Sequence, residues 1–459
     1  MTKNLSRRNF VHMSVGALAS TAALGTFGGL GKALAATADT SGYKALVCVF
    51  LYGGNSSFNW VVPTSNAKYE EYRKARSSLA LAQNSLLPLN GTAGDGHSYG
   101  LHPNCTELQH LFNTDKAAVI CNVGTLVRPV TRVQARGGSI ELPPQLFSHI
   151  DQQTQWMTSF AQSPERYGWA GRVADLYASQ GATANLAFNI DVGGVNYWQE
   201  GRTSIPYVLG ANGAPALFVT ADSRYRNGLR QRAAQTILDQ AAKDPNKLVQ
   251  QLAGIERNAA DKESFINAAF SAAGDLRTPF PVIPGDGGFG AQLHEVARCI
   301  KAHSHIGDAR QMFFVQLSGF DTHNAELATH GSLMKILSEN LNTFYKALGE
   351  IGMQNEVTTF TASDFGRTLG ANTDGSDHAW GGHSLVLGGA VRGGKYYGTM
   401  PSLVINGESD IGNGRIIPTT STDQYMGTLA RWFGVGDSSL DAVFPNLANF
   451  KERNLGFLG

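Results

Sequence analysis

The chain has 459 residues, of which 37 are basic and 36 acidic, so its formal net charge at pH 7 is +1. This balance argues against a polyanion-binding surface, so we do not expect nucleic acid as a partner. The 53 glycines favour many tight turns over a helical bundle. A chain of this length can fold as one large α/β domain with insertions or as two domains.

The N-terminal segment has the features of an export signal. Arg7 and Arg8 precede a mildly apolar stretch at 15–24 and a small-residue cleavage pattern at 33–35. The segment resembles a twin-arginine signal, although an ordinary amphipathic helix would also fit. We therefore predict a signal peptide at 1–36 and a periplasmic or secreted protein. No later stretch approaches the roughly 20 apolar residues needed to cross a bilayer, so we expect no stable membrane span.

Apolar runs typical of buried parallel strands alternate with helix-like segments along most of the chain. This alternation predicts an α/β fold with a mostly parallel sheet. The predicted strands are 45–51, 117–124, 185–190, 216–220, 312–317 and 357–361, and the predicted helices include 105–113, 292–301 and 325–337.

A polar, helix-forming block interrupts the alternation at about 222–280. It is nearly free of glycine and proline up to residue 272, and a stretch rich in both residues follows at 279–288. We interpret the block as a helical insertion, a cap or a lid, within an α/β domain at 43–459.

Four cysteines make an even set in a compartment that we expect to be oxidising. Disulfides are therefore allowed, with three possible connectivities. Cys48 and Cys121 lie inside predicted strands, where buried free thiols are the favoured interpretation.

Acidic and histidine residues follow two predicted strands in the C-terminal third of the chain. Because parallel strands end at one edge of a sheet, these side chains should lie close together, where open α/β sheets place their chemistry. Carboxylates and imidazoles together suit zinc, manganese or iron, although an Asp at a strand end can also cap the next helix. The candidate metal ligands are Asp321, His323, Asp364, Asp377 and His378, with His383 as a further one.

Seven short motifs occur in order over nearly the whole chain after the signal. They include Gly53-Gly54-Asn55, Ser148-His149, 319–323, 363–368 and Asp377-His378. These motifs resemble the exported bacterial family called domain of unknown function 1501, which is similar to the alkaline phosphatase and sulfatase superfamily. The resemblance implies a three-layer, alkaline-phosphatase-like sandwich with a metal site at the carboxyl ends of the strands. It also implies hydrolysis of a small anionic phosphate or sulfate ester.

Such enzymes need a nucleophile at a helix N-terminus, where free N–H groups and the helix dipole stabilise an oxyanion. Ser148 is the best candidate because it directly precedes a predicted helix. The alternative is that this serine serves simply as the N-cap of that helix. The sequence leaves three roles open for His149, which are binding a metal ion, acting as a general base and packing against other side chains. Arg367 would neutralise the substrate anion or pair with Asp364.

Two positions depart from the pattern that the resemblance implies. The family usually has Asp where this chain has Ser56, and the superfamily tends to have a metal-binding His where Phe365 stands. A neutral hydroxyl does not supply the charge that a divalent ion needs, so metal affinity is expected to fall or be lost. The leading hypothesis is a metal-assisted ester hydrolase. The alternative is a catalytically degenerate protein that binds a ligand or assembles with an exported partner protein.

Overall fold

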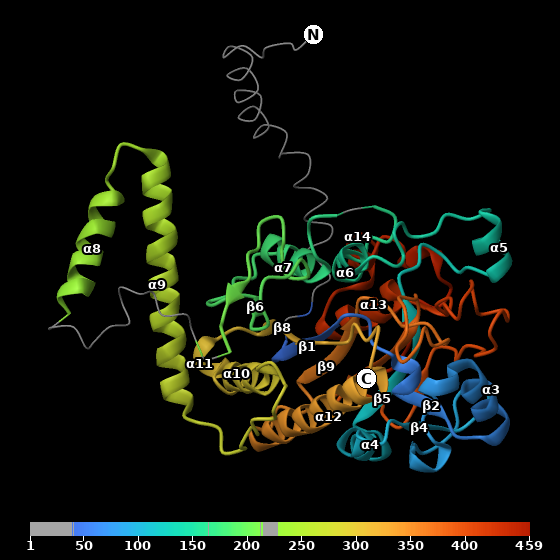
Figure 1. Ribbon diagram of the computed structural model, residues 1–459. Coiled ribbons are helices and arrows are strands. Elements are labelled where there is room, and N and C mark those ends of the chain that lie inside the picture. The colour runs from blue at the N-terminus through green and yellow to red at the C-terminus, as the bar shows by residue number, and fades with distance from the viewer. Residues whose placement is uncertain (1–38, 40, 164, 212, 214–227) are drawn as a thin grey trace, which may run out of the picture.

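The computed structural model describes residues 39, 41–163, 165–211, 213 and 228–459. The predicted signal peptide at 1–36 and the predicted strand at 216–220 lie outside these residues. The described part of the chain is a mixed α/β structure built on one large central sheet with helices on both faces (Figure 1).

The central sheet contains nine strands in the order β11, β5, β10, β9, β1, β8, β6 and β7, with β12 paired to β5. β1 lies in the middle, parallel to both β8 and β9. β10 is the exception to the parallel arrangement, because it runs antiparallel to β5 and β9. The strands are β1 (Lys44–Tyr52), β5 (Ala117–Gly124), β6 (Asn189–Asp191), β7 (Tyr207–Val208), β8 (Arg310–Ser318), β9 (Val357–Ser363), β10 (Gly382–Leu387), β11 (Tyr396–Tyr397) and β12 (Thr420–Ser421).

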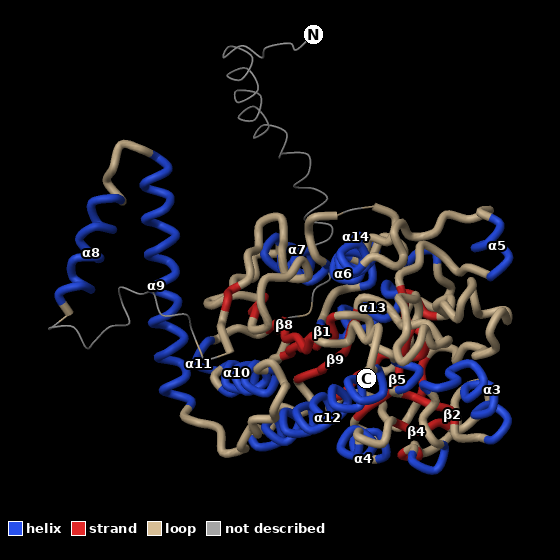
Figure 2. Tube along the Cα trace, viewed as in Figure 1, coloured by secondary structure: helices blue, strands red, loops and turns tan. Residues whose placement is uncertain are grey.

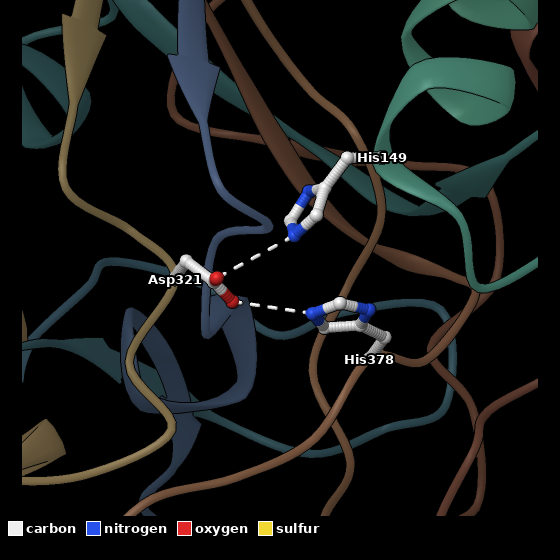
Figure 3. A group of neighbouring side chains, drawn as sticks. All are labelled: His149, Asp321 and His378. Atoms are coloured by element: carbon white, nitrogen blue, oxygen red, sulfur yellow. Dashed lines mark hydrogen bonds and ion pairs between the residues drawn. The ribbon is translucent and has the colours of Figure 1, made fainter.

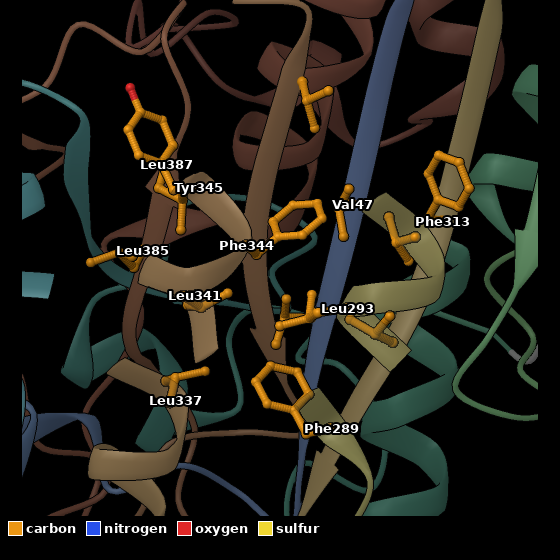
Figure 4. Packing of buried hydrophobic residues seen from close by; sticks show 14 of the residues in the cluster. Val47, Phe289, Leu293, Phe313, Leu337, Leu341, Phe344, Tyr345, Leu385 and Leu387 are labelled. Carbon is orange, nitrogen blue, oxygen red and sulfur yellow. The ribbon is translucent and has the colours of Figure 1, made fainter. Parts of the chain in front are cut away.

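Two hydrophobic cores cover the two faces of this sheet. Along β1, Val47 and Val49 pack into one core, whereas Cys48 and Phe50 pack into the other. Because side chains alternate along a strand, a strand that is buried on both faces needs an unbroken apolar run, which is what the sequence provides. Figure 4 shows the first core, where side chains of β1 and β8 meet those of α10 and α12.

Helices α4, α10 and α12 pack on one face of the sheet, and α6, α7, α13 and α14 pack on the other, which gives the molecule three layers (Figure 1). The three-layer α/β architecture expected from the sequence is therefore confirmed. The bounds are α4 (Thr106–Asn113), α6 (His149–Thr158), α7 (Trp169–Ser179), α10 (Phe289–Lys301), α12 (Glu326–Glu350), α13 (Thr422–Phe433) and α14 (Asp437–Val443).

The remaining elements lie around this sandwich (Figure 2). A small antiparallel sheet has the order β2, β4, β3. Its strands are β2 (Val61–Pro63), β3 (Leu87–Pro88) and β4 (Tyr99–Leu101). The smaller helices are α3 (Asn66–Arg76), α5 (Arg132–Gly137) and α11 (His303–Ile306). Short 3-10 turns are formed by Ser57–Asn59, Ser77–Leu79, Gln83–Ser85 and Leu447–Asn449.

The predicted strand at 185–190 is largely wrong, because β6 begins only at Asn189. The Asp308 carboxylate accepts hydrogen bonds from the backbone N–H groups of Asn185 and Leu186, at 2.5 and 3.2 Å. These two donors are therefore satisfied by a side chain and not by a neighbouring strand.

Two helices occupy the described part of the predicted insertion. They are α8 (Leu229–Ala241) and α9 (Lys247–Ala273), which pack against each other and project from one side of the molecule (Figure 1). Among the described residues, no helix is long and apolar enough to cross a membrane. All four cysteines are buried and free, so the disulfides that the sequence allowed do not form.

Candidate functional site

The site lies where three neighbouring strands end. Tyr52 of β1 is in register with Ser318 of β8, and Leu51 of β1 is in register with Ser363 of β9. The segments that follow these strands therefore leave the sheet side by side. They carry polar groups from three distant parts of the sequence to one place.

Gly53 allows these segments to approach each other closely. Its φ of +116° is unfavourable for residues with a side chain, and a Cβ atom there would overlap the backbone nitrogen of Asp321. Its N–H group points at both oxygens of Asp364, at 3.3 Å each. The glycine after β1 thus sets the distance between the two strand-end carboxylates.

Three histidines surround the carboxylate of Asp321. The Nε2 atoms of His323 and His378 lie 3.1 and 3.2 Å from Asp321 Oδ1, and His149 Nε2 lies 3.5 Å from Asp321 Oδ2. The Nε2 atoms of His323 and His378 also face each other at 2.9 Å. Figure 3 shows His149 and His378 pointing at Asp321 from two sides.

Each of these imidazoles has an oxygen acceptor on its outer side. His149 Nδ1 lies 2.5 Å from Asp364 Oδ2, His323 Nδ1 lies 3.2 Å from Asp377 Oδ1, and His378 Nδ1 lies 2.8 Å from the Phe147 carbonyl oxygen. Because carboxylate and carbonyl oxygens accept hydrogen bonds, the Nδ1 atoms carry the hydrogens. In a neutral ring, Nε2 then presents a lone pair to the centre.

This arrangement fits a divalent transition metal. Two facing Nε2 lone pairs beside a carboxylate repel one another unless a proton or a metal ion lies between them. His149, Asp321 and His378 each offer a ligand atom, and these three atoms lie within 4.8 Å of one another. Outer acceptors on the Nδ1 atoms are the usual support of metal-bound histidines. Nitrogen donors with one carboxylate suit zinc, manganese or iron.

Arg367 donates hydrogen bonds to Asp321 and to the loop that follows β1. Its Nη1 donates to Asp321 Oδ1 at 2.9 Å and to the Gly53 carbonyl oxygen at 3.0 Å. Burial alone would raise the pKa of Asp321, but the Arg367 hydrogen bond and charge, together with His323, lower it. Asp321 is therefore held as a carboxylate.

The pKa values of His149 and His378 are shifted in opposite directions. The hydrogen bond to Asp364 raises the pKa of His149, whereas burial lowers the pKa of His378. The lowered pKa keeps the His378 ring neutral, which is the form that can ligate a metal ion.

The structure brings the predicted ligands together in two shells. Asp321, His323 and His378 meet at the centre. Asp364 and Asp377 instead accept hydrogen bonds from the outer nitrogens of His149 and His323. The role of His149 was open from sequence, and its position at the first residue of α6 places its ring at the centre.

The two predicted catalytic residues have other partners. The Ser148 hydroxyl donates to Asp151 at 2.5 Å, and the structure records no contact between that hydroxyl and Asp321. The Arg367 side chain is fully buried, and its Nε, Nη1 and Nη2 atoms all donate to protein oxygens. Four of the five N–H donors of Arg367 therefore have a protein acceptor, and the side chain has no exposed surface that could meet a substrate anion.

Ser56 faces a buried ion pair and not the histidines. Its hydroxyl donates to Glu326 Oε1 at 2.7 Å, and Arg76 donates to Ser56 Oγ at 3.1 Å and also to Glu326. Neither charged side chain has any solvent exposure. Ser376 donates to the other Glu326 oxygen and accepts from Arg367 Nε at 3.1 Å. Hydrogen bonds thus connect Arg76 to Arg367 behind the site.

Sequence reasoning did not identify Arg76 and Glu326. Arg76 ends the polar helix α3 and Glu326 opens α12, which are positions where charged residues are usually solvated. An acidic residue in the first turn of α12 is also expected simply from the helix dipole.

His383 lies outside the centre. Its ring packs edge-on against Phe58 at 5.0 Å, and the Asn122 N–H group points at its Nδ1 at 3.2 Å. Burial lowers the pKa of His383 to about 3. His383 is therefore a neutral core residue.

The sheet topology and the strand-end site define an α/β protein with a candidate mononuclear His/Asp metal centre. A family profile described as a protein of unknown function (DUF1501) matches residues 43–443, so the chain belongs to that family. A search of curated proteins finds no match.

Solved structures give distant similarities. The chain is similar to the PsFucS1 sulfatase from Pseudoalteromonas sp., at 10% identity and a TM-score of 0.34, with 91% of this chain and 70% of that chain covered. It is also similar to a mutant of the alkaline phosphatase PafA, at 11% identity and a TM-score of 0.28, with 71% and 64% covered. At these TM-scores the matches assign no activity to this chain.

Proposed function

We propose that the protein hydrolyses phosphate or sulfate esters with the help of one divalent metal ion. The observation that carries the proposal is the convergence of three Nε2 atoms on Asp321, each ring fixed from outside by an oxygen acceptor. Such an ion polarises an ester oxygen and makes water a better nucleophile at neutral pH.

The residues of the chain would have distinct tasks. His149, His323, His378 and Asp321 would hold the ion, and Asp364 and Asp377 would orient two of the rings. Since the Ser148 hydroxyl is bound to Asp151 at 2.5 Å, we favour water over Ser148 as the nucleophile.

Arg415 is the cation best placed to attract an anionic ester. Its Nε donates to the His378 carbonyl oxygen at 3.1 Å, and its guanidinium lies over the Phe147 ring at 4.6 Å from the centroid. No carboxylate among the described residues forms an ion pair with it. Because the Arg367 side chain is fully buried, we assign the recognition of the substrate charge to Arg415.

The first experiment measures metal binding by metal analysis and by calorimetric titration of chelator-treated protein with zinc and manganese. We expect one ion per chain, and we expect Asp321→Asn and His378→Ala to lose it. His305→Ala is the matched control, because His305 is exposed and lies outside the cluster. Binding that survives both site variants would contradict the proposal.

The second experiment tests turnover with 4-nitrophenyl phosphate and 4-nitrophenyl sulfate. We expect the metal-loaded protein to hydrolyse at least one of them, and Arg415→Gln to raise KM more than it lowers kcat. If the Ser148→Ala variant alone abolished hydrolysis while metal binding stayed intact, Ser148 would be the nucleophile after all.

A second candidate function rests on Ser56. Its hydroxyl is bound by Glu326 and Arg76, so β1 contributes no carboxylate to the metal centre. This favours a degenerate protein that binds an anion or an exported partner without turnover. Saturable binding of phosphate or sulfate by metal-loaded protein, with no ester hydrolysed, would support this function over catalysis.

A further inference from the structure

The helical hairpin formed by α8 and α9 exposes an unusual amount of apolar surface. Sixteen large hydrophobic side chains are exposed in the described part of the chain, and six of them lie between residues 229 and 265. Scattered exposed apolar residues are normal, but a concentration of them marks an interaction surface. The six are Leu229, Ile237, Leu248, Leu252, Ile255 and Phe265.

Three of these residues form a seam on the free half of α9. Leu248, Leu252 and Ile255 are 73%, 59% and 65% exposed, and they are spaced by four and then three residues. This is the a/d spacing of helices that pack along their length against another helix. The described residues place no helix over this seam, although α8 packs beside it.

The other half of α9 is firmly attached to the molecule. Ile266 and Phe270 belong to the first hydrophobic core, and the Arg298 guanidinium lies 4.2 Å from the Phe270 ring centroid. Lys262 Nζ donates to the Leu186 carbonyl oxygen at 2.5 Å. The Arg257–Asp239 ion pair, at 2.6 Å, ties α8 to α9. The hairpin is therefore presented as a fixed arm.

The charges of the hairpin favour self-association. Residues 229–273 contain six basic and five acidic residues, so the arm is almost neutral. Helices that lie on membranes carry an excess of Lys and Arg on their polar face, which this arm lacks. In a two-fold dimer a surface meets its own copy, so it must be self-complementary, and balanced charge satisfies that condition.

We propose that the α8–α9 hairpin pairs with the same hairpin of a second copy of this chain. Two hairpins make a four-helix bundle, which is the smallest symmetric assembly that buries the seams of both copies. The pairing is independent of the chemistry at Asp321, because the hairpin stands on one side of the molecule, apart from α6 (Figure 1).

The test is the molar mass of the purified protein, measured by light scattering and by sedimentation over a wide range of concentrations. We expect a dimer, with twice the mass of a single chain. The double variant Leu252→Asp/Ile255→Asp should be a monomer with an unchanged circular dichroism spectrum, because both residues are exposed in the single chain. The matched control is Val133→Asp/Val282→Asp, whose two positions are 82% and 94% exposed elsewhere, and which should remain a dimer.

Two results would overturn the proposal. One is a wild-type protein that is monomeric at every concentration. If that monomer also sediments with phospholipid vesicles, the seam binds a membrane instead of a second copy. The other is a dimer that the hairpin variant leaves intact, which would place the interface elsewhere. An Ile255→Cys variant adds an independent readout, because all native cysteines are buried. We expect a bismaleimide with a long flexible spacer to link two chains of this variant and not of the wild type, and a dimeric variant that is not linked would contradict pairing through this seam.

Discussion

The buried pair of Arg76 and Glu326 gives the sharpest prediction about stability. Both side chains have 0% exposure, and Arg76 also donates to Asn59 Oδ1 at 3.0 Å and to the Thr368 carbonyl oxygen at 2.8 Å. Replacing Arg76 by Met leaves the Glu326 carboxylate buried without a countercharge. It also removes the donor to the Thr368 and Leu369 carbonyl oxygens, whereas Asn59 Oδ1 keeps the Tyr72 hydroxyl as a donor.

Breaking a buried ion pair by removing one partner costs about 3–5 kcal/mol. Because Arg76 also satisfies a backbone carbonyl and a side-chain oxygen, we expect Arg76→Met to lower the free energy of unfolding by an amount near the upper end of that range. The double variant Arg76→Met/Glu326→Gln removes both charges. Its loss should be smaller than the sum of the two single losses by about 1 kcal/mol or more, as is typical of coupled contacts.

The assay is urea unfolding of chelator-treated protein, so that metal binding does not contribute to the measured stability. Arg73→Met is the matched control in the same helix, because Arg73 pairs with Glu70 on the surface with both side chains about half exposed. Exposed pairs contribute little, so this variant should unfold almost like the wild type. The reasoning is refuted if Arg76→Met costs no more than Arg73→Met, or if the two single losses simply add.

Three further predictions concern the metal centre and the core. Asp364→Asn removes the charged acceptor of His149 Nδ1 and should weaken zinc binding by about 10- to 100-fold in calorimetric titration; unchanged affinity would exclude this role. Gly53→Ala should displace Asp321 and weaken zinc binding in the same titration, because φ at this position is +116°; a variant with wild-type affinity would show that the loop adapts. Burial raises the pKa of Asp423 from 3.8 to about 7, so the protonated form is favoured in the folded state. The stability that this group contributes is complete below pH 3.8 and is lost as the pH rises through about 7, by up to about 4 kcal/mol. Asp423→Asn should therefore flatten the fall of the thermal midpoint between pH 5 and 8. An equally steep fall in that variant would contradict the assignment.

Some of the site followed from sequence because its signals are local. Asp321 and Asp364 come three residues and one residue after the ends of β8 and β9, which the sequence predicts as buried strands, and parallel strands end at one edge of a sheet. The expectation that Asp321 would meet His323 and His378 therefore needed no knowledge of the packing, whereas Asp364 meets His149 instead. The distances of 3.1 and 3.2 Å from Asp321 to the two rings agree with it.

Other roles were beyond sequence reasoning because they depend on contacts between distant segments. His149 reaches Asp364 across 215 positions of the chain, and Arg76 reaches Glu326 across 250. Nothing in a local pattern distinguishes an arginine that ends up buried from one that stays solvated. Arg367 illustrates the same limit, since only the folded structure shows that its side chain is buried and bonded to protein oxygens.

The sequence by itself determined the central strands β1, β5, β8 and β9 and the polar residues that follow them, because strand-like runs and their ends are properties of short segments. The tertiary structure decided which strands are neighbours, including the antiparallel insertion of β10 between β5 and β9. It also decided which carboxylates face the centre and which stand behind a histidine. The physical reason is that pairing and burial are settled by the whole fold, through contacts whose partners lie hundreds of residues apart.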